Sequence, residues 1–201
     1  MGLIVKNEQK PREVIPAGVH HAVCYGLYDI GTHYNERYNK SDRKCIILWE
    51  FPAIRMEYTK DGVTKDLPKV ISKKYTVSLN EKATLRKDLQ SWRGKVFSDQ
   101  ELAGFDLKNI LGVNCMLQII HNASSDGQQT YSNIATVLPL YGGIPSVVPE
   151  TPIQFFSLEE SETVPEYTPK WIAELIGKCK ELNEYVGHKD EVPVSGEDAP
   201  F

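Results

Sequence analysis

The clearest pattern in the chain joins an alternating segment to a helical segment within residues 70–95. Apolar residues occupy every second position of 73–79, the period of a strand with one buried face, and these positions are Tyr75, Val77 and Leu79. Apolar residues then recur at helical spacing, at Leu85, Leu89 and Trp92, before Gly94, a residue type that often ends a helix. The pattern predicts one strand that leads directly into one helix.

Four further strands are predicted from β-branched and aromatic runs separated by turn signals. They cover residues 19–30, 44–51, 114–121 and 131–139. Within the first run Gly26 predicts a bulge and Gly31 the end of the strand, and Pro52 predicts the end of the second. Tight turns are predicted at Asp61-Gly62 and Asp126-Gly127.

A second short helix is predicted where Ser98 and Glu101 form a capping-box pattern. The order is therefore three strands, a helical segment and two strands, with polar loops at 32–43 and 122–130. This is the element order of the OB-fold, a small barrel that binds oligonucleotides through strands two and three and the two flanking loops. An SH3-like barrel would lack the helix before strand four, and a ferredoxin-like fold would have a helix after its first strand. We expect a mainly β, OB-fold-like five-stranded Greek-key barrel with a helix between strands 3 and 4.

The rest of the chain surrounds this domain. The predicted segments are a flexible lead-in at 1–17, an OB-like nucleic-acid-binding domain at 18–141, a Pro-rich linker at 142–167, a C-terminal helix at 168–186 and a disordered acidic tail at 187–201. The helix is expected to start with Thr168 as its N-cap and Pro169 in its first turn. Its apolar stripe is Ile172, Leu175, Ile176, Cys179 and Leu182. Because a single amphipathic helix is not stable alone, it must dock on the barrel, on a partner or on another copy.

Composition and charge narrow the possible functions. The 201 residues are 41% hydrophobic and 25% charged, which suits a globular domain. No apolar run is long enough for a membrane span and no signal-peptide pattern is present, so we expect a cytoplasmic protein. Residues 1–150 carry 19 Lys/Arg and 16 Asp/Glu (+3), and residues 151–201 carry 4 and 11 (−7), which together give −4. A basic-patched body with an acidic tail is typical of nucleic-acid-binding proteins, and a solubilising tail is the alternative explanation.

Chemistry-bearing residues do not form a catalytic or metal-binding pattern. The cysteines Cys24, Cys45, Cys115 and Cys179 are scattered without metal-ligand spacing and are expected to be buried thiols. The five histidines form no HExxH motif, and no GxSxG, P-loop or GxGxxG occurs. We therefore expect a non-enzymatic protein without a metal or cofactor.

Cations and aromatic rings are interleaved as single-strand binding requires, since phosphates need cations and bases need flat rings on which to stack. The candidates are Tyr34, Arg37, Tyr38, Lys40, Arg43, Lys44, Trp49, Lys73, Lys74, Tyr75, Trp92, Arg93 and Tyr131. Lys73 and Lys74 are the strongest phosphate candidates. Trp49, Tyr75 and Trp92 lie on apolar stripes, so burial in the core is the competing interpretation for them.

The last residues resemble a known peptide signal. Glu197, Asp198, Ala199, Pro200 and Phe201 are similar to the acidic tip of bacterial single-stranded DNA-binding proteins, which ends in aspartates, isoleucine, proline and phenylalanine. In that family the tip fills a basic-rimmed hydrophobic pocket on replication and repair partners. The resemblance implies that Glu197, Asp198, Pro200 and Phe201 bind a partner protein; Ala199 stands where that family has isoleucine.

The body of the chain resembles a family of bacteriophage replication-module proteins taken to bind single-stranded DNA. The segments that carry the resemblance are GVHHAVCYGLYDIGT, ILWEFP, KKYTVSLNEKATLRKDLQSWRGK, GFDLKNILG and NIATVLPL, which together span roughly residues 18–140. The resemblance implies an OB-type fold and a role in replication or recombination.

These observations predict a sequence-tolerant single-stranded DNA-binding protein whose acidic tail recruits replication or recombination proteins, and which is cytoplasmic in a bacterial host if a phage encodes it. Two alternatives stay open: an OB-like interaction or assembly module, with the 168–185 helix as a dimer or partner interface, and an RNA-binding factor. The sequence contains no signal that separates DNA from RNA.

Overall fold

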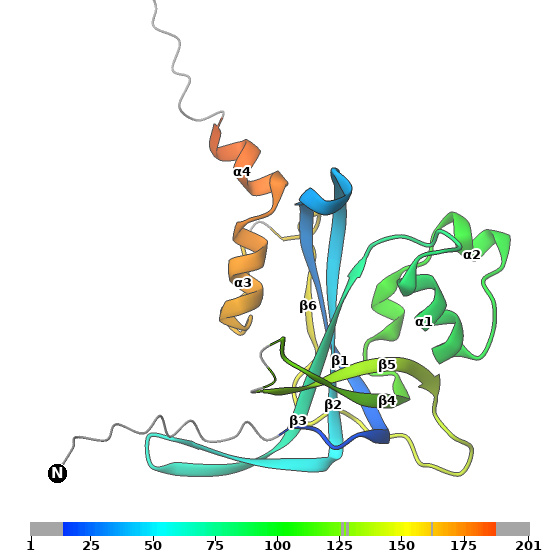
Figure 1. Ribbon diagram of the computed structural model, residues 1–201, viewed down its shortest axis with the longest axis vertical. Coiled ribbons are helices and arrows are strands. Elements are labelled where there is room, and N and C mark those ends of the chain that lie inside the picture. Colours follow the sequence, from blue (N-terminus) through cyan, green and yellow to red (C-terminus); the bar gives the residue numbers. More distant parts are fainter. Residues whose placement is uncertain (1–13, 126, 128, 162, 188–201) are drawn as a thin grey trace, which may run out of the picture.

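A computed structural model describes residues 14–187 except 126, 128 and 162, and it is mainly β (Figure 1). The main sheet is antiparallel with strand order β3-β2-β1-β4-β5, and a short strand, β6, pairs in parallel with β1. The strands are β1 (Gly18–Asn35), β2 (Lys40–Lys60), β3 (Val63–Thr76), β4 (Asn114–Ala123), β5 (Thr130–Pro139) and β6 (Gln154–Phe156). The helices are α1 (Thr84–Arg93), α2 (Asp99–Ala103), α3 (Lys170–Gly177) and α4 (Lys180–Gly187), with 3-10 turns at Glu36–Tyr38 and Leu107–Ile110.

The five predicted strands are present, but the first three are longer than predicted, and β3 begins at Val63 and ends at Thr76, before the predicted Val77 and Leu79. Gly31 does not end β1: with φ 74° it lies at a register shift, and the strand continues to Asn35. Pro52 does not end β2 either, because it lies in the irregular stretch between Phe51 and Arg55, where no ladder hydrogen bond needs its missing N–H. The predicted polar loop at 32–43 is instead the end of a two-stranded ribbon closed by a 3-10 turn.

The predicted bulge at Gly26, turn at Asp61-Gly62, capping box at Ser98 and helix end at Gly94 are confirmed, whereas Asp126 of the other predicted turn lies outside the described residues. A register shift lies between Cys24 and Gly26, where a Cβ on Gly26 would come within 2.7 Å of Leu48. Asp61 and Gly62 both have positive φ, 51° and 77°, as a two-residue hairpin turn requires. The capping box at Ser98 is formed, and α1 ends at Gly94 in the left-handed conformation.

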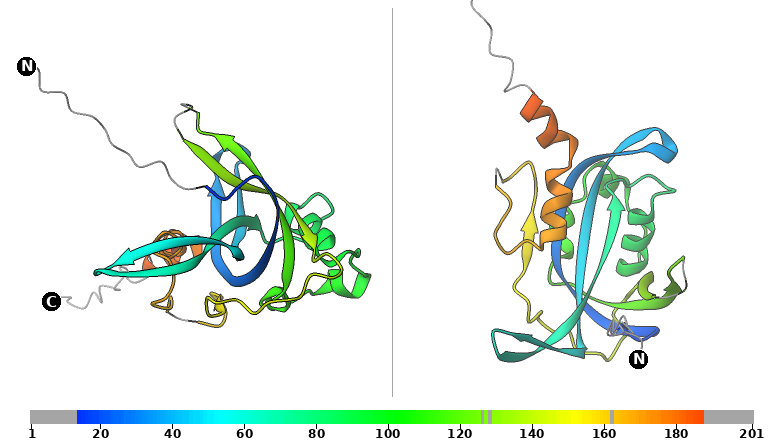
Figure 2. Two further views of the ribbon diagram at one scale, coloured as in Figure 1. Left: turned by 90° about the horizontal axis from the view of Figure 1, so that it is seen from below. Right: turned by 60° about the vertical axis from the view of Figure 1, so that its left-hand side comes forward.

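Both faces of the β1–β2 pair are buried, each in a separate apolar cluster. The inner cluster lies between the sheet and α1, whose Leu85, Leu89 and Trp92 are buried as predicted. It includes Trp49 and Trp92, with ring centroids 5.8 Å apart. The outer cluster joins Tyr25, Tyr28, Ile30, Ile46 and Leu48 of the sheet to Phe156, Ile172 and Ile176 of β6 and α3. Figure 2 shows α3 lying along this outer face.

The sheet is not closed into a barrel in the part of the chain that the structure describes, because β3 and β5 are its two edges and do not pair. The opening between them is a hollow of about 240 Å³ lined by 70–72, 130–132, Val14 and Ile15. Ile15 is buried, and its carbonyl accepts hydrogen bonds from His121 Nε2 (2.8 Å) and Ser132 Oγ (3.0 Å). The end of the predicted lead-in is therefore anchored to the sheet, whereas residues 1–13 lie outside the described part.

The segment predicted as a linker, 142–167, is held against the sheet. The carboxylate of Glu50, which has no exposed surface, accepts hydrogen bonds from the backbone N–H groups of Glu150 (2.6 Å) and Thr151 (3.0 Å). Asn114 exchanges hydrogen bonds with both backbone groups of Val147, and β6 follows shortly afterwards. The Pro-rich segment therefore runs along the sheet and is not a free linker.

The predicted C-terminal helix is two helices, α3 and α4, interrupted at Lys178 and Cys179. Its predicted start is off by one residue, since Pro169 is the N-cap and the buried Thr168 precedes it. Of the three docking options, the structure shows docking on the body of the same chain, here on the sheet: Ile172, Ile176 and Cys179 are fully buried. No helix in the described residues is long and apolar enough to span a membrane.

The junction between α3 and α4 depends on the absence of a side chain at Gly31. A Cβ built on Gly31 would lie 2.5 Å from Cys179 Cβ, which is closer than real carbon atoms approach. Next to it, the carboxylate of Glu181 accepts hydrogen bonds from the Thr32 backbone N–H (2.8 Å) and hydroxyl (2.7 Å). The C-terminal helices thus contact β1 through the close approach of Cys179 to Gly31 and through the hydrogen bonds of the Glu181 carboxylate to Thr32.

Substituting Gly31→Ala is expected to lower the free energy of unfolding by about 2 to 5 kcal/mol, the sum of left-handed backbone strain and overpacking. The matched control is Gly94→Ala, which has a similar φ of 65° but no atom within 4 Å of the new Cβ, so it carries the backbone strain alone. Urea unfolding of both variants measures the difference. Equal destabilisation would show that the contact with Cys179 contributes nothing.

Glu181 should make the docking of α4 sensitive to acid. Burial alone would raise the pKa of Glu181, but the hydrogen bonds from Thr32 lower it to about 2. Because the folded-state pKa lies below the unfolded value of about 4.3, this stabilisation is complete above that value and is lost as the pH falls toward 2. The stability difference between wild type and Glu181→Gln, measured by denaturant unfolding, should therefore shrink across this window. A difference that is constant from pH 7 to pH 2 would contradict the assignment.

Candidate nucleic-acid interface

Strand register decides which predicted cations share a surface. Ile46 on β2 is directly opposite Lys74 on β3, and Lys44 is opposite Thr76. Directly opposed residues of an antiparallel pair point to the same face, and residues two apart on one strand do so as well. Lys44 and Lys74 therefore stand on the outer face together with Ile46, which belongs to the cluster under α3.

These two lysines border a hollow of about 240 Å³ at the upper end of the sheet. Its lining residues are Ile30, His33, Tyr34, Asn35, Lys44, Lys74 and Leu175. Tyr34 is 61% exposed, and its hydroxyl donates to Asn39 Oδ1 at 2.5 Å. Lys44 Nζ donates to Thr76 Oγ1 at 2.6 Å and lies 3.6 Å from Asp42. Three predicted residues from three different strands thus meet at one place; we call this set of lining residues the Lys74 hollow.

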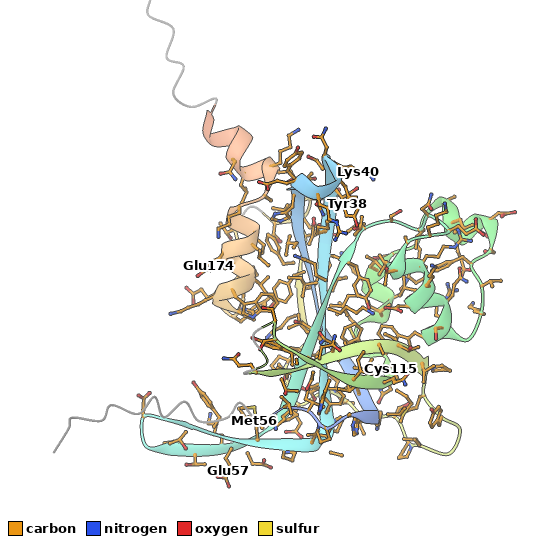
Figure 3. All side chains as sticks on the ribbon, in the orientation of Figure 1. Tyr38, Lys40, Met56, Glu57, Cys115 and Glu174 are labelled. Atoms are coloured by element: carbon orange, nitrogen blue, oxygen red, sulfur yellow. The ribbon has the colours of Figure 1, made fainter. Side chains whose placement is uncertain are left out.

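Three more predicted residues lie beyond the hollow at the tip of the β1–β2 ribbon. Figure 3 labels Tyr38 and Lys40 there. The guanidinium of Arg37 lies 5.6 Å from the centroid of the Tyr38 ring, and Tyr38 is 69% exposed. Lys40 forms an ion pair with Asp42 (2.7 Å) while its side chain stays mostly exposed. This pairing with two lysines lowers the pKa of Asp42.

Tyr131 lies on the other side of β3. It is 42% exposed at the start of β5 and lines the β3–β5 opening together with Val70 and Ser72. Its hydroxyl donates to Gln129 at 2.9 Å. β3 therefore lies between an exposed tyrosine at the Lys74 hollow and another at the opening.

Three predicted aromatic contacts are wrong because the rings belong to the core. Trp49 is completely buried, and Trp92 is buried with its indole N–H donating to the carbonyl of Asn114 (3.0 Å). Tyr75 is 3% exposed; burial raises its pKa, and Asp88, which accepts its hydroxyl hydrogen, raises it further. Burial in the core, the competing interpretation from the apolar stripes of the sequence, is therefore what the structure shows for all three rings.

Three predicted cations are already neutralised by carboxylates. Lys73, one residue from Lys74 but on the opposite face, pairs with Asp88 at 2.7 Å. Arg43 pairs with Asp29 (2.5 Å) and Glu159 (2.6 Å), and these bonds raise its pKa. Arg93 pairs with Glu101 and stacks over the rings of Phe97 and Phe105. Their partners are distant in sequence or on another element, so the charge pattern alone did not show the pairing.

A second hollow, of about 250 Å³, lies between β1, the 105–108 segment and the chain after β6. Its cations are Arg43 and Lys108, and Lys108 pairs with Glu160 at 2.6 Å and lies over the Phe155 ring. Glu159 and Glu160 already pair with these two cations. This hollow is therefore a weaker candidate site for a bound anion than the Lys74 hollow.

Four members of the Lys74 hollow are not among the residues predicted from the sequence: Ile30, His33, Asn35 and Leu175. His33 lies in the predicted polar loop 32–43 but belongs to β1, and its Nε2 bonds the carbonyl of Ile30 at 2.8 Å. Leu175 was recognised as apolar, but only the packing of α3 shows which surface it borders.

The remaining predictions on chemistry concern metals, thiols and the tail. The four cysteines are free and buried, as predicted, and burial raises the pKa of Cys45 to about 12. Among the described residues, no group of three or more histidine, cysteine or acidic side chains is arranged to hold a metal ion. The predicted partner-binding residues Glu197, Asp198, Pro200 and Phe201 lie outside the described residues.

Comparison of the chain with protein-family models, with curated proteins and with solved structures gave no match. The surface chemistry described above is therefore the basis for assigning a function.

Proposed function

We propose that this protein binds single-stranded DNA without strong sequence preference and acts in phage-type DNA replication or recombination. The observation that carries the proposal is the meeting of Tyr34, Lys44 and Lys74 around one hollow on the outer face of β1–β3. Lysines attract phosphates, and an exposed tyrosine ring stacks on a base of any identity. The protein would bind through chemistry that every nucleotide offers.

The strand order supports an OB-like architecture for this site. The order β3-β2-β1-β4-β5, with α1 between β3 and β4, corresponds to an OB barrel opened between β3 and β5. In such a barrel oligonucleotides bind on the face of strands two and three, between the β1–β2 and β4–β5 loops. Lys74 lies on that face, Tyr34 and Tyr38 are near the first loop, and Tyr131 follows the second. The position of the cluster therefore agrees with its chemistry.

The first test is a fluorescence-anisotropy titration with labelled oligo-dT at several salt concentrations. We expect binding at low salt and a linear fall of log affinity with log salt, with a slope of about −0.7 for each phosphate contacted. Lys74→Gln should weaken binding and reduce the steepness by about 0.7, because one phosphate contact is lost. Absence of binding at low salt would overturn the proposal.

Two lysines serve as controls for Lys74. Lys87→Gln removes the same charge from the exposed face of α1 and should leave both affinity and salt slope unchanged. Lys73→Gln removes the adjacent cation, but because it faces Asp88 it should lower stability and leave the salt slope unchanged. A uniform loss of affinity in all three variants would indicate a general charge effect and not a site.

An RNA-binding factor is the nearest alternative, because A-form contacts and stacking use the same residue types. Competition between oligo-dT and oligo-U of equal length separates the two. As for an interaction module built on the C-terminal helix, the apolar stripe of α3 is already used against the sheet, which disfavours a second copy or partner on that stripe.

The acidic C-terminus has a separate place in the proposal, as a peptide that recruits replication or recombination proteins. Deleting 197–201 should leave affinity for oligo-dT equal or slightly higher, because like-charge repulsion of the DNA is removed. Affinity capture with identification by mass spectrometry should lose replication proteins. The control variant Asp190→Asn with Glu191→Gln removes two negative charges but keeps residues 197–201. It should still capture the replication proteins. Identical captures from the deletion and the wild type would show that the tip recruits nothing.

A further inference from the structure

α3 contacts β1, shares the Lys74 hollow with β3 through Leu175, and presents an exposed tryptophan. Trp171 is 46% exposed, whereas the other two tryptophans, Trp49 and Trp92, are buried in the inner cluster. We propose that α3 forms the second wall of the nucleic-acid site and that Trp171 stacks on a base of the bound strand. This inference rests on the proposed function and adds to it a residue from a different part of the chain.

The helical period places Trp171 on the flank that borders the Lys74 hollow. Leu175 on α3 lines this hollow together with Lys74. Trp171 precedes Leu175 by four residues, so the two share one side of the helix and are about 6 Å apart along its axis. The side of α3 that faces the sheet is a different one, occupied by the buried Ile172 and Ile176. The indole is therefore on the flank beside the hollow and is not part of the packing under the helix.

The charges around this flank favour a polyanion. Lys44 and Lys74 line the hollow, and Lys178 is exposed at the C-terminal end of α3. Of the acidic residues nearby, Glu174 points away from the sheet in Figure 3, and Asp42 is shared between Lys40 and Lys44. Glu181 is bound to Thr32. A single-stranded nucleic acid matches both the lysines and the indole, because its phosphates can pair with the lysines and its bases can stack on Trp171.

Two aromatic side chains then border the lysines from separate elements, Tyr34 on β1 and Trp171 on α3. Stacking of a base on an aromatic ring contributes comparably at each such platform and tolerates any base. The C-terminal helices thereby acquire a role beyond covering the sheet. Their attachment through Gly31 and Glu181 positions one wall of the site.

Intrinsic fluorescence tests the inference directly because Trp171 is the one exposed tryptophan of three. Saturating oligo-dT should quench the emission of the wild-type protein. In Trp171→Phe the remaining emission, from Trp49 and Trp92, should not respond to oligo-dT. Trp171→Leu should weaken binding about 5-fold or more by anisotropy, and Trp171→Phe, which keeps a flat ring, should retain most of the affinity.

Two controls separate stacking from other effects. Tyr141→Leu removes another exposed ring, 48% accessible and located after β5, and should leave affinity unchanged. An abasic oligonucleotide of the same length carries the phosphates without the bases and should not quench Trp171.

The outcomes distinguish this inference from the proposed function. Oligo-dT binding by anisotropy, with no quenching and with normal affinity of Trp171→Leu, would overturn the role of Trp171 and leave the proposed function standing. Equal quenching by the abasic strand at saturation would overturn stacking. Absence of any binding by the wild type would remove the proposed function and this inference together.

Discussion

Burial of both faces of the β1–β2 pair is the constraint on which the rest of the structure depends. One face carries Trp49 and Ile47 into the cluster under α1, and the other carries Tyr28 and Ile46 into the cluster under β6 and α3. A strand with one apolar face needs a covering layer on that face alone, but the β1–β2 pair is apolar on both faces and needs a layer on each. The Pro-rich segment and the C-terminal helices supply the second layer, which explains why 142–187 lies on the sheet and is not a tether. The close approach at Gly31 and the Glu50 carboxylate hold that layer in place.

The position of the candidate site follows from where this cover ends. α3 lies over β1 and β2 but leaves β3, the edge strand, with one face at the surface. On β3 the alternation of side chains then separates neighbours: Tyr75 and Lys73 face α1 and Asp88, while Lys74 faces outward. The border between α3 and β3 is thus the place where apolar packing gives way to exposed cations and rings.

Electrostatics makes that border distinct from the rest of the basic body. Arg43, Lys73, Arg93 and Lys108 each have a carboxylate partner within the fold, so the charges of these four cations are compensated locally. Surface ion pairs contribute little to stability, but they remove cations from the set that an incoming polyanion can use. Around the Lys74 hollow the acidic side chain near the lysines is Asp42, which two lysines share. A summed charge over the sequence could not locate this difference.

The sequence by itself determined what is local: the five strands, the Asp61-Gly62 turn, the capping box at Ser98, and α1 with its three buried side chains, because dihedral preference and hydrophobic period act over a few residues. It also showed which residue types were available for binding. Only the tertiary structure decided that Gly31 and Pro52 interrupt strands without ending them, that β6 and α3 cover the sheet, and which cations are paired. Strand neighbours and carboxylate partners can be more than a hundred residues apart in the sequence, as Arg43 and Glu159 are with a separation of 116. Contacts over such separations leave no period in the chain.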